Sequence, residues 1–209
     1  MVESGGFYGA FVDPVLVKMR KKVAAHIEPQ QKIIDVACGT GAQVFELAKN
    51  AEFVMGVDLS SSMIKKAAQT KIKQGFENTG FKVCDATQLV HFKEKEFDVA
   101  TMSLALHQFS PLLYSSILGE MKRISAKIVI VDYSVPLPKN IAGYGSRWAE
   151  FIAGREHHRN FRKFCKNGGL ENVLKENGLA IKKSVYFARD TFQLVVALAN
   201  GKEKDGKTG

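Results

Sequence analysis

The chain has 209 residues, of which 45% are hydrophobic and 24% are charged, and its formal net charge is +9. This length and composition predict a single globular domain. No apolar run approaches the ~20 residues of a membrane-spanning helix, and the first residues lack the basic and apolar regions of a secretory signal.

Three scattered cysteines, Cys38, Cys84 and Cys165, form no C-x-x-C pair. This pattern favours reduced thiols in a cytoplasmic protein and argues against a zinc site, so we expect no bound metal. The positive charge could attract an anionic partner such as RNA or a lipid surface. Because no RNA-binding motif accompanies the charge, we favour a solvated surface and leave both partners as open alternatives.

The first predicted element is a helix that begins at Asp13 and Pro14, which read as an N-cap and a proline at the first helical position. Apolar residues then recur at helical spacing as far as Ile27. Packing of this helix across the edge of a sheet is one expectation from the pattern.

A strand, a glycine turn and a helix follow in direct succession. The apolar run Ile33–Val36 predicts a buried strand, the turn carries Gly39 and Gly41, and a helical pattern starts near Ala42. Glycine adopts backbone angles that are closed to other residues, and a helix start directs free N–H groups and a positive dipole end towards a ligand. The arrangement is typical of the opening of a nucleotide-type site.

Two common phosphate-binding motifs fit this turn poorly. The dinucleotide fingerprint G-x-G-x-x-G/A requires a small residue at the position that Val44 occupies. No G-x-x-x-x-G-K-[ST] sequence is present, which argues against a P-loop. A plain strand–turn–helix unit without a ligand remains an alternative.

The stretch Asp35-Val36-Ala37-Cys38-Gly39-Thr40-Gly41 resembles the first motif of the class I S-adenosylmethionine-dependent methyltransferases, whose usual form is D/E-x-G-x-G-x-G. Ala37 replaces the first glycine of that motif. Within the family, the chain looks like the methyltransferase type 11, or ubiquinone and menaquinone biosynthesis-like, branch. The resemblance implies S-adenosyl-L-methionine as cofactor, S-adenosyl-L-homocysteine as product, and a helix before the first strand that covers the substrate side.

A second buried strand, Phe53–Val57, ends at Asp58, which lies 17 positions after Gly41. Parallel neighbouring strands end at the same crevice, where a carboxylate can accept hydrogen bonds from both hydroxyls of a ribose. The alternative is a cap on the next helix, but Ser60, Ser61 and Ser62 already supply caps. That helix is predicted from Ser61 to Gln74, stopped by Gly75, with these residues facing inward: Met63, Ile64, Ala67, Ala68 and Ile72.

The third predicted strand, Phe81–Cys84, ends at Asp85 and Ala86. The resemblance implies that Asp85 binds the adenine amino group and that the next backbone N–H meets the ring, whereas a turn-forming aspartate is the alternative. The fourth strand, 97–102, leads into a stretch that the resemblance places at the methionine end of the cofactor. Its candidates for the wall near the methyl group are Met102, Ser103 and His107, although His107 could equally cap the following turn.

A helix from Pro111 to Ser125, a fifth strand at 127–132 and a short helix at 170–177 complete the α/β alternation. Two β runs, 180–187 and 192–199, are joined by four residues, which is too short for a parallel crossover. The fold is therefore predicted to be α/β: a three-layer α-β-α Rossmann-like domain whose seven-stranded sheet is mostly parallel with an antiparallel last strand.

The domain is expected to span residues 1–200, with a polar tail at 201–209 that we expect to be disordered. An aromatic and basic insertion at about 133–169 is predicted to cover the substrate. It contains His157 and His158, which lack the neighbours of a metal site and give only a possible general base.

The resemblance implies transfer of a methyl group to a small-molecule acceptor, expected to be aromatic or apolar, at an oxygen, carbon or nitrogen atom. A general base is needed only if the acceptor loses a proton, and the candidates are Tyr8, His107, Tyr144 and His158. The alternatives are an RNA or phospholipid methyltransferase and a non-catalytic methyltransferase-like binding module. The complete set of expected cofactor-binding residues is Asp35, Ala37, Cys38, Gly39, Thr40, Gly41, Asp58, Leu59, Met63, Asp85, Ala86, Met102, Ser103 and His107.

Overall fold

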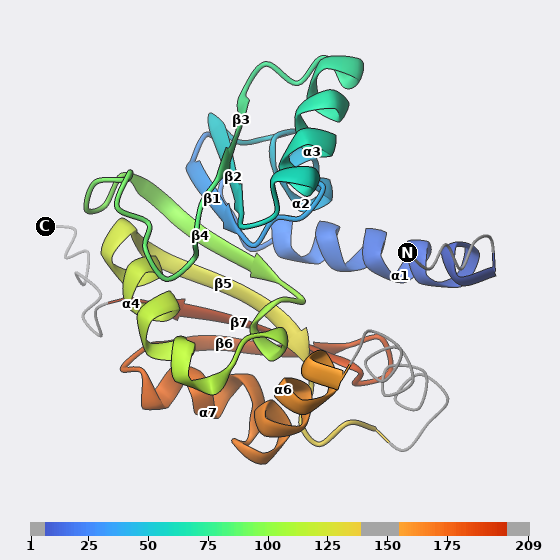
Figure 1. Ribbon diagram of the computed structural model, residues 1–209, viewed down its shortest axis with the longest axis vertical. Coiled ribbons are helices and arrows are strands. Elements are labelled where there is room, and N and C mark those ends of the chain that lie inside the picture. The colour runs from blue at the N-terminus through green and yellow to red at the C-terminus, as the bar shows by residue number, and fades with distance from the viewer. Residues whose placement is uncertain (1–6, 139–154, 200–209) are drawn as a thin grey trace, which may run out of the picture.

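A seven-stranded sheet forms the centre of the protein (Figure 1). The computed structural model describes the backbone of residues 7–138 and 155–199 and the side chains of residues 14–138 and 156–199. The strands lie in the order β3-β2-β1-β4-β5-β7-β6. Their bounds are β1 Lys32–Val36, β2 Phe53–Asp58, β3 Thr79–Val83, β4 Phe97–Ser103, β5 Ser125–Tyr133, β6 Ala180–Phe187 and β7 Phe192–Leu198.

Strand direction agrees with the prediction from the sequence. Strands β1 to β5 pair in parallel, and β7 is antiparallel to both β5 and β6. The four residues between β6 and β7 allow only a hairpin, because a parallel connection needs a crossover of a dozen or more residues. The mostly parallel α/β sheet with an antiparallel last strand is thereby confirmed.

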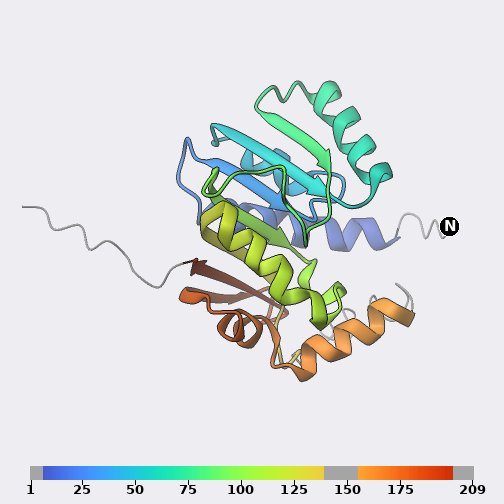
Figure 2. The same ribbon diagram turned by 60° about the vertical axis from the view of Figure 1, so that its left-hand side comes forward.

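Helices cover both faces of this sheet, and the turned view separates the layers (Figure 2). Their bounds are α1 Phe7–Ala24, α2 Ala42–Leu47, α3 Ser61–Gln74, α4 Tyr114–Ile124, α6 Arg155–Lys166 and α7 Gly169–Glu176, with short 3-10 helices η1 Leu106–Gln108 and η2 Pro111–Leu113. One core lies between the sheet and α4 with α7, and the second lies between the sheet and α1 with α2. Because the central strands are buried on both faces, they read as continuous apolar runs.

Successive residues of β1 point into opposite cores. Ile34 and Val36 pack in the core beneath α4, whereas Ile33 packs in the core beneath α1 and α2. The alternation of side chains along a strand therefore directs Asp35 to the same face as Ile33. The Asp35 carboxyl group therefore lies in the core between the sheet and helices α1 and α2, close to the glycine turn.

Two details of the helices differ from the prediction. Helix α1 begins at Phe7, and Pro14 lies within it, so the proline is not the first helical residue. Proline lacks an N–H wherever it stands, and its presence alone does not fix a helix start. On α3, Ile64 and Ala67 are buried, but Met63 and Ile72, which were also predicted to face inward, are 39% and 82% exposed, because this helix packs mainly against the β2 and β3 edge of the sheet.

The longest of the described helices is α1, with 18 residues. Across residues 7–138 and 155–199, no helix combines the length and apolar character needed to cross a bilayer.

Candidate functional site

The turn after β1 requires glycine for two different reasons. Gly39 and Gly41 have φ angles of 54° and 82°, which lie in the left-handed region. A Cβ on Gly41 would stand 2.8 Å from the Phe81 ring, so packing excludes a side chain there. A Cβ on Gly39 would meet no atom within 4 Å. The backbone at Gly39 is therefore open to a ligand, while Gly41 holds the turn against β3.

The Asp58 carboxylate joins the end of β2 to this turn. Its Oδ2 accepts a hydrogen bond from the Gly39 N–H at 2.8 Å, and its Oδ1 accepts one from the Ser60 N–H at 2.8 Å. Ser60 is the N-cap of α3, and its hydroxyl accepts from Met63 N–H. Because an ionised carboxylate has about four acceptor positions, Asp58 retains capacity for further donors. It stands beside the open backbone of Gly39, at the carboxyl end of the parallel strand that neighbours β1.

Asp35 is buried in the middle of the sheet beside this turn. It pairs in register with Thr101 of β4, whose hydroxyl donates to Asp35 Oδ1 at 2.5 Å. The pKa of Asp35 is raised to about 7, mainly by burial; the Thr101 hydrogen bond acts against this rise and the nearby Asp58 charge adds to it. A carboxylate in this position favours the approach of a cation.

Cys38 and Thr40 occupy the remaining positions of the turn. Cys38 is partly buried, and a Cβ on Gly56 would come within 2.9 Å of its sulfur, so the thiol fills the space beside β2. Burial, together with the charges of Asp35 and Asp58, holds the pKa of Cys38 well above its usual range. The thiol is therefore a packing group, because nucleophilic cysteines need the thiolate form. Thr40 is exposed.

The end of β3 shows the turn-forming aspartate that the sequence left as an alternative. Asp85 Oδ1 accepts from both the N–H and the hydroxyl of Thr87 at 2.8 Å. Asp85 is exposed and Ala86 is buried, so the other carboxylate oxygen keeps its acceptor capacity and the adenine-binding role stays a prediction. Leu59 and Met63, which follow Asp58 on the neighbouring strand end, are both exposed.

The carboxyl end of β4 lies beside the glycine turn, because β4 pairs with β1. Met102 is fully buried in the core beneath α4, so only its backbone faces a ligand at the strand end. The Ser103 hydroxyl donates to Gln43 Oε1 at 3.5 Å. Ala37 and Leu104 have positive φ angles of 58° and 52°, and such strained non-glycine residues gather at functional sites.

His107 and Asp132 form a buried pair at the ends of β4 and β5. The His107 Nδ1–H donates to Asp132 Oδ1 at 2.5 Å, and the His107 backbone N–H donates to Oδ2 at 3.1 Å. Their side chains are 1% and 0% exposed, and the rings of Tyr133 and Phe161 pack edge-on against the imidazole. The structure therefore gives His107 a buried acid as partner, in addition to the two expected roles of lining the methyl group and capping the turn. Asp132 was missed, although an acid at the end of the fifth strand was visible in the sequence.

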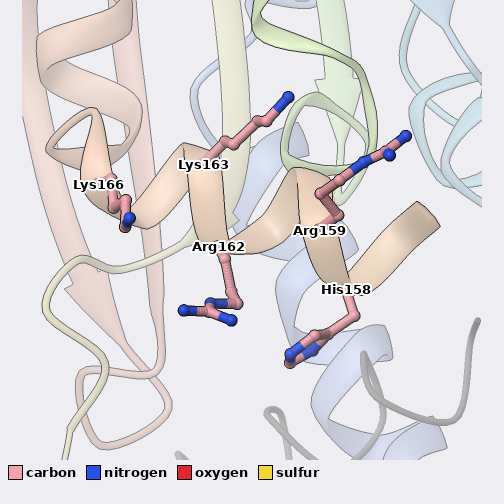
Figure 3. Close-up of a pocket in the computed structure, with 5 residues that line it drawn as sticks. All are labelled: His158, Arg159, Arg162, Lys163 and Lys166. Carbon is pink, nitrogen blue, oxygen red and sulfur yellow. The ribbon is translucent and has the colours of Figure 1, made fainter. Parts of the chain in front are cut away.

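Of the other candidate bases, two lie outside the described side chains and one lies on α6. The side chain of Tyr8 and the whole of Tyr144 fall outside the described residues. His158 lies on α6, among basic side chains that line a shallow depression of about 260 Å³ (Figure 3). Helix α6 sits next to the carboxyl end of β5 (Figure 1), and Asn160 fixes it to η1 by donating to the Gln108 carbonyl at 2.8 Å.

Metal ligands do not gather in the part of the chain with described side chains. No group of three or more His, Cys, Asp or Glu residues is close enough there to hold an ion. His157 and His158, which are neighbours on α6, belong to no such group among the described residues.

The alanine in the motif provides a direct test of the strain at the turn. Replacing Ala37 with glycine should raise the free energy of unfolding by about 0.5–1 kcal/mol, because a left-handed backbone is unfavourable by ~1–2 kcal/mol for an L-residue and glycine recovers most of this. Urea denaturation measures the change. The matched control is Ala42→Gly at the start of α2, where φ is helical and glycine should lower stability by about 0.5–1 kcal/mol. An equal fall in the free energy of unfolding in both variants would contradict backbone strain at Ala37.

Comparison with known proteins agrees with this geometry. Residues 27–178 match the methyltransferase domain family. An uncharacterised methyltransferase of Synechocystis is 26% identical over 183 residues, covering 83% of this chain and 78% of the relative. Phosphoethanolamine N-methyltransferase 1 of Arabidopsis thaliana is 29% identical, covering 73% of this chain and 31% of the relative. Demethylmenaquinone methyltransferase of Beutenbergia cavernae is 29% identical, covering 52% and 43%. The chain thus spans less than half the length of the last two relatives.

Solved structures share the fold at lower identity. Magnesium protoporphyrin IX methyltransferase from Synechocystis, crystallised with bound SAH, has a TM-score of 0.65, with 17% identity over 95% of this chain and 90% of that chain. A SAM-dependent methyltransferase from Aquifex aeolicus has a TM-score of 0.64, with 17% identity over 87% of this chain and 89% of that chain. The family match over most of the chain, the strand order and the motif at the β1 turn lead to one conclusion. This chain belongs to the class I methyltransferases, the enzymes that use S-adenosylmethionine as methyl donor.

Proposed function

We propose that this enzyme transfers the methyl group of S-adenosylmethionine to a small-molecule acceptor. The observation that carries the proposed site is the open backbone at Gly39 beside the Asp58 carboxylate. The cofactor would lie across the carboxyl ends of β1, β2 and β4, with its ribose at Asp58 and its adenine between Asp85 and the exposed side chains of Leu59 and Met63. Ser103 and the Met102 backbone would stand at the methionine end.

The sulfonium of the bound cofactor supplies an activated methyl group. The chain's own residues then need to orient the acceptor and exclude water, and orientation alone can supply up to ~7–11 kcal/mol of the barrier. Asp35 lies inside the sheet next to the turn and would attract the cationic part of the cofactor. Asp58 would hold the ribose by accepting from its hydroxyls, which fixes the sulfonium relative to the end of β4.

For the acceptor, we propose its chemical class only. Relatives named for quinone and phosphoethanolamine methylation support a small molecule. The aromatic and basic segment at about 133–169 is proposed as the substrate cover, which favours an aromatic or apolar acceptor. A general base would be required only for an acceptor that loses a proton, and among the four candidate residues His107 has the best-defined surroundings.

We also propose that residues 1–200 form a single domain and that the protein is located in the cytoplasm. Cys38 and Cys84 are free thiols, which supports a reducing compartment. Two alternative functions are kept: a methyltransferase acting on RNA or phospholipid, and a non-catalytic domain that only binds the cofactor. Transfer of label from the cofactor to a small-molecule fraction of a cell extract would favour the proposed function, and binding without transfer would favour the last alternative.

Calorimetry tests the cofactor site directly. Titration with S-adenosylmethionine should give saturable binding, and titration with NAD or ATP should give none. Binding of NAD in place of S-adenosylmethionine would reject the proposed occupant of the turn, because it would show that the site accepts a pyrophosphate.

Replacement of Asp58 by alanine should weaken cofactor binding by about 1–3 kcal/mol, since it removes an acceptor for buried polar partners. The variant also loses the bond to Gly39 N–H, which positions the turn. The control is Asp98→Ala, because Asp98 likewise accepts from a backbone N–H, that of Lys32, but lies at the opposite end of β4. Unchanged affinity in the Asp58 variant would remove this residue from the site.

A further inference from the structure

Helix α6 carries a concentration of positive charge on its outer surface. Its sequence, REHHRNFRKFCK, contains five Lys or Arg residues and a single acid. Arg159, Arg162, Lys163 and Lys166 are exposed. Arg162, Lys163 and Lys166 form no ion pair with any side chain that the structure describes, and Arg159 has only a long, exposed contact of 3.8 Å with Glu156. Such an exposed pair neutralises little charge.

The helix is sharply divided into a buried face and a basic face. Asn160, Phe161 and Phe164 are buried against the domain. At 100° per residue, the side chains of positions 158, 162, 166, 159 and 163 spread over roughly 140° on the opposite side. Figure 3 shows His158 and Arg162 extending to one side of the helix and Arg159 and Lys163 to the other. The cations therefore form a broad surface and do not converge on a single point.

An exposed apolar segment packs against the same helix. The short helix η2 packs against α6, and its Leu112 is 89% exposed while Leu113 is also exposed. Apolar side chains beside a row of Lys and Arg are the combination by which peripheral helices bind the interface of a bilayer. The partly buried Asn160–Gln108 hydrogen bond holds α6 in place beside η1, so the surface is preformed.

We propose that the basic face of α6, together with Leu112 and Leu113 of η2, docks the enzyme on an anionic phospholipid surface. A broad, exposed set of cations suits a planar array of lipid phosphates, to which each Lys or Arg near the surface contributes about 1 kcal/mol. A compact phosphate would instead favour converging donors. Single-stranded nucleic acid would favour exposed aromatic rings between the cations, and the aromatic residues of α6, Phe161 and Phe164, are buried.

The position of the surface gives it a consequence for the reaction. Helix α6 adjoins the carboxyl end of β5, and η1 connects it to the end of β4, where the proposed site lies. Docking through α6 would bring this end of the sheet to the membrane. An acceptor dissolved in the lipid would then reach the site without crossing water. This consequence rests on the proposed function, whereas the docking itself does not.

Co-sedimentation with vesicles tests the docking on the whole 209-residue chain without cofactor. The protein should bind vesicles of phosphatidylcholine mixed with phosphatidylglycerol, and binding should fall steeply with added salt. The triple variant Arg162→Gln, Lys163→Gln, Lys166→Gln should bind about a hundredfold more weakly, at about fivefold for each cation removed. The matched control, Lys65→Gln, Lys66→Gln, Lys73→Gln, removes the same charge from exposed positions of α3 and should lose no more than about threefold.

Leu112→Ser should weaken vesicle binding severalfold without changing its salt dependence. Equal binding to pure phosphatidylcholine, or equal losses in the α6 and α3 variants, would overturn the proposal. Tight binding of single-stranded RNA without vesicle binding would overturn it in favour of a nucleic-acid surface, and full competition by inorganic pyrophosphate would overturn it in favour of a compact anion site. Calorimetry with S-adenosylmethionine on the same variants keeps the two proposals separate, because its affinity should not change.

Discussion

Replacement of Asp132 by alanine should lower the free energy of unfolding by about 3–5 kcal/mol, the usual effect of removing one partner from a buried ion-pair or hydrogen-bonded network. Three donors converge on this carboxylate: the Nδ1–H and backbone N–H of His107 and the backbone N–H of Tyr133. All lie where water has no access, because Asp132 is fully buried. Alanine would leave the three donors without an acceptor, and urea denaturation would measure the loss.

Two comparisons make this result specific. Asp132→Asn keeps one carbonyl acceptor and should be destabilised less than the alanine variant. Asp98→Ala removes a carboxylate that also accepts from a backbone N–H, at 2.7 Å, but this group is exposed and water can replace it. Its loss should therefore stay below about 1 kcal/mol. A similar decrease in the free energy of unfolding for the Asp98 and Asp132 variants would contradict a larger stabilising effect of the buried pair with His107.

Replacement of Asp35 by asparagine should stabilise the cofactor-free protein above pH 7, by a margin on the order of 4 kcal/mol. The folded protein holds the pKa of Asp35 at about 7, compared with 3.8 for the ordinary group. Between these values the folded state binds more protons than the unfolded state, so stability falls as the pH rises and levels off above 7. Asparagine removes this titration and retains an oxygen that can accept from Thr101.

Denaturation midpoints at a series of pH values would measure the difference. The two proteins should have similar stability near pH 4 and should diverge as the pH approaches 7. Cofactor affinity gives a second readout, because a bound cation near Asp35 favours the ionised carboxylate. Affinity should rise with pH more steeply in the wild type than in Asp35→Asn, and the comparison cancels the titration of the cofactor itself. Parallel stability curves would show that Asp35 is already ionised in the free protein.

Local signals in the sequence predicted several elements well. Helix α3 has the expected bounds, Ser61–Gln74, because both of its ends are set locally: Ser60 caps the first turn and Gly75 ends the last in a left-handed conformation. The antiparallel hairpin of β6 and β7 likewise follows from a four-residue link. The predicted start of α1 was wrong, because the helix begins at Phe7 and Pro14 lies within it.

Contacts between residues that are far apart in the sequence could not be predicted from it. Asp35 and Thr101 are separated by 66 positions, and His107 and Asp132 by 25, yet each pair is in hydrogen-bond contact. No periodicity or motif specifies such a pair, because it depends on which strands become neighbours. The same holds for the division of α6 into a buried and a basic face, which depends on what the helix packs against.

The sequence by itself determined the succession of strands and helices, the glycine turn and the acids at the strand ends, because hydrophobic period, capping residues and turn lengths act over a few neighbouring residues. Only the tertiary structure decided that β4 lies beside β1, that Asp58 holds Gly39, and that Asp132 belongs to His107. These contacts arise when distant segments are brought together by burial of the two cores, and the energy of a buried polar group depends on that final packing.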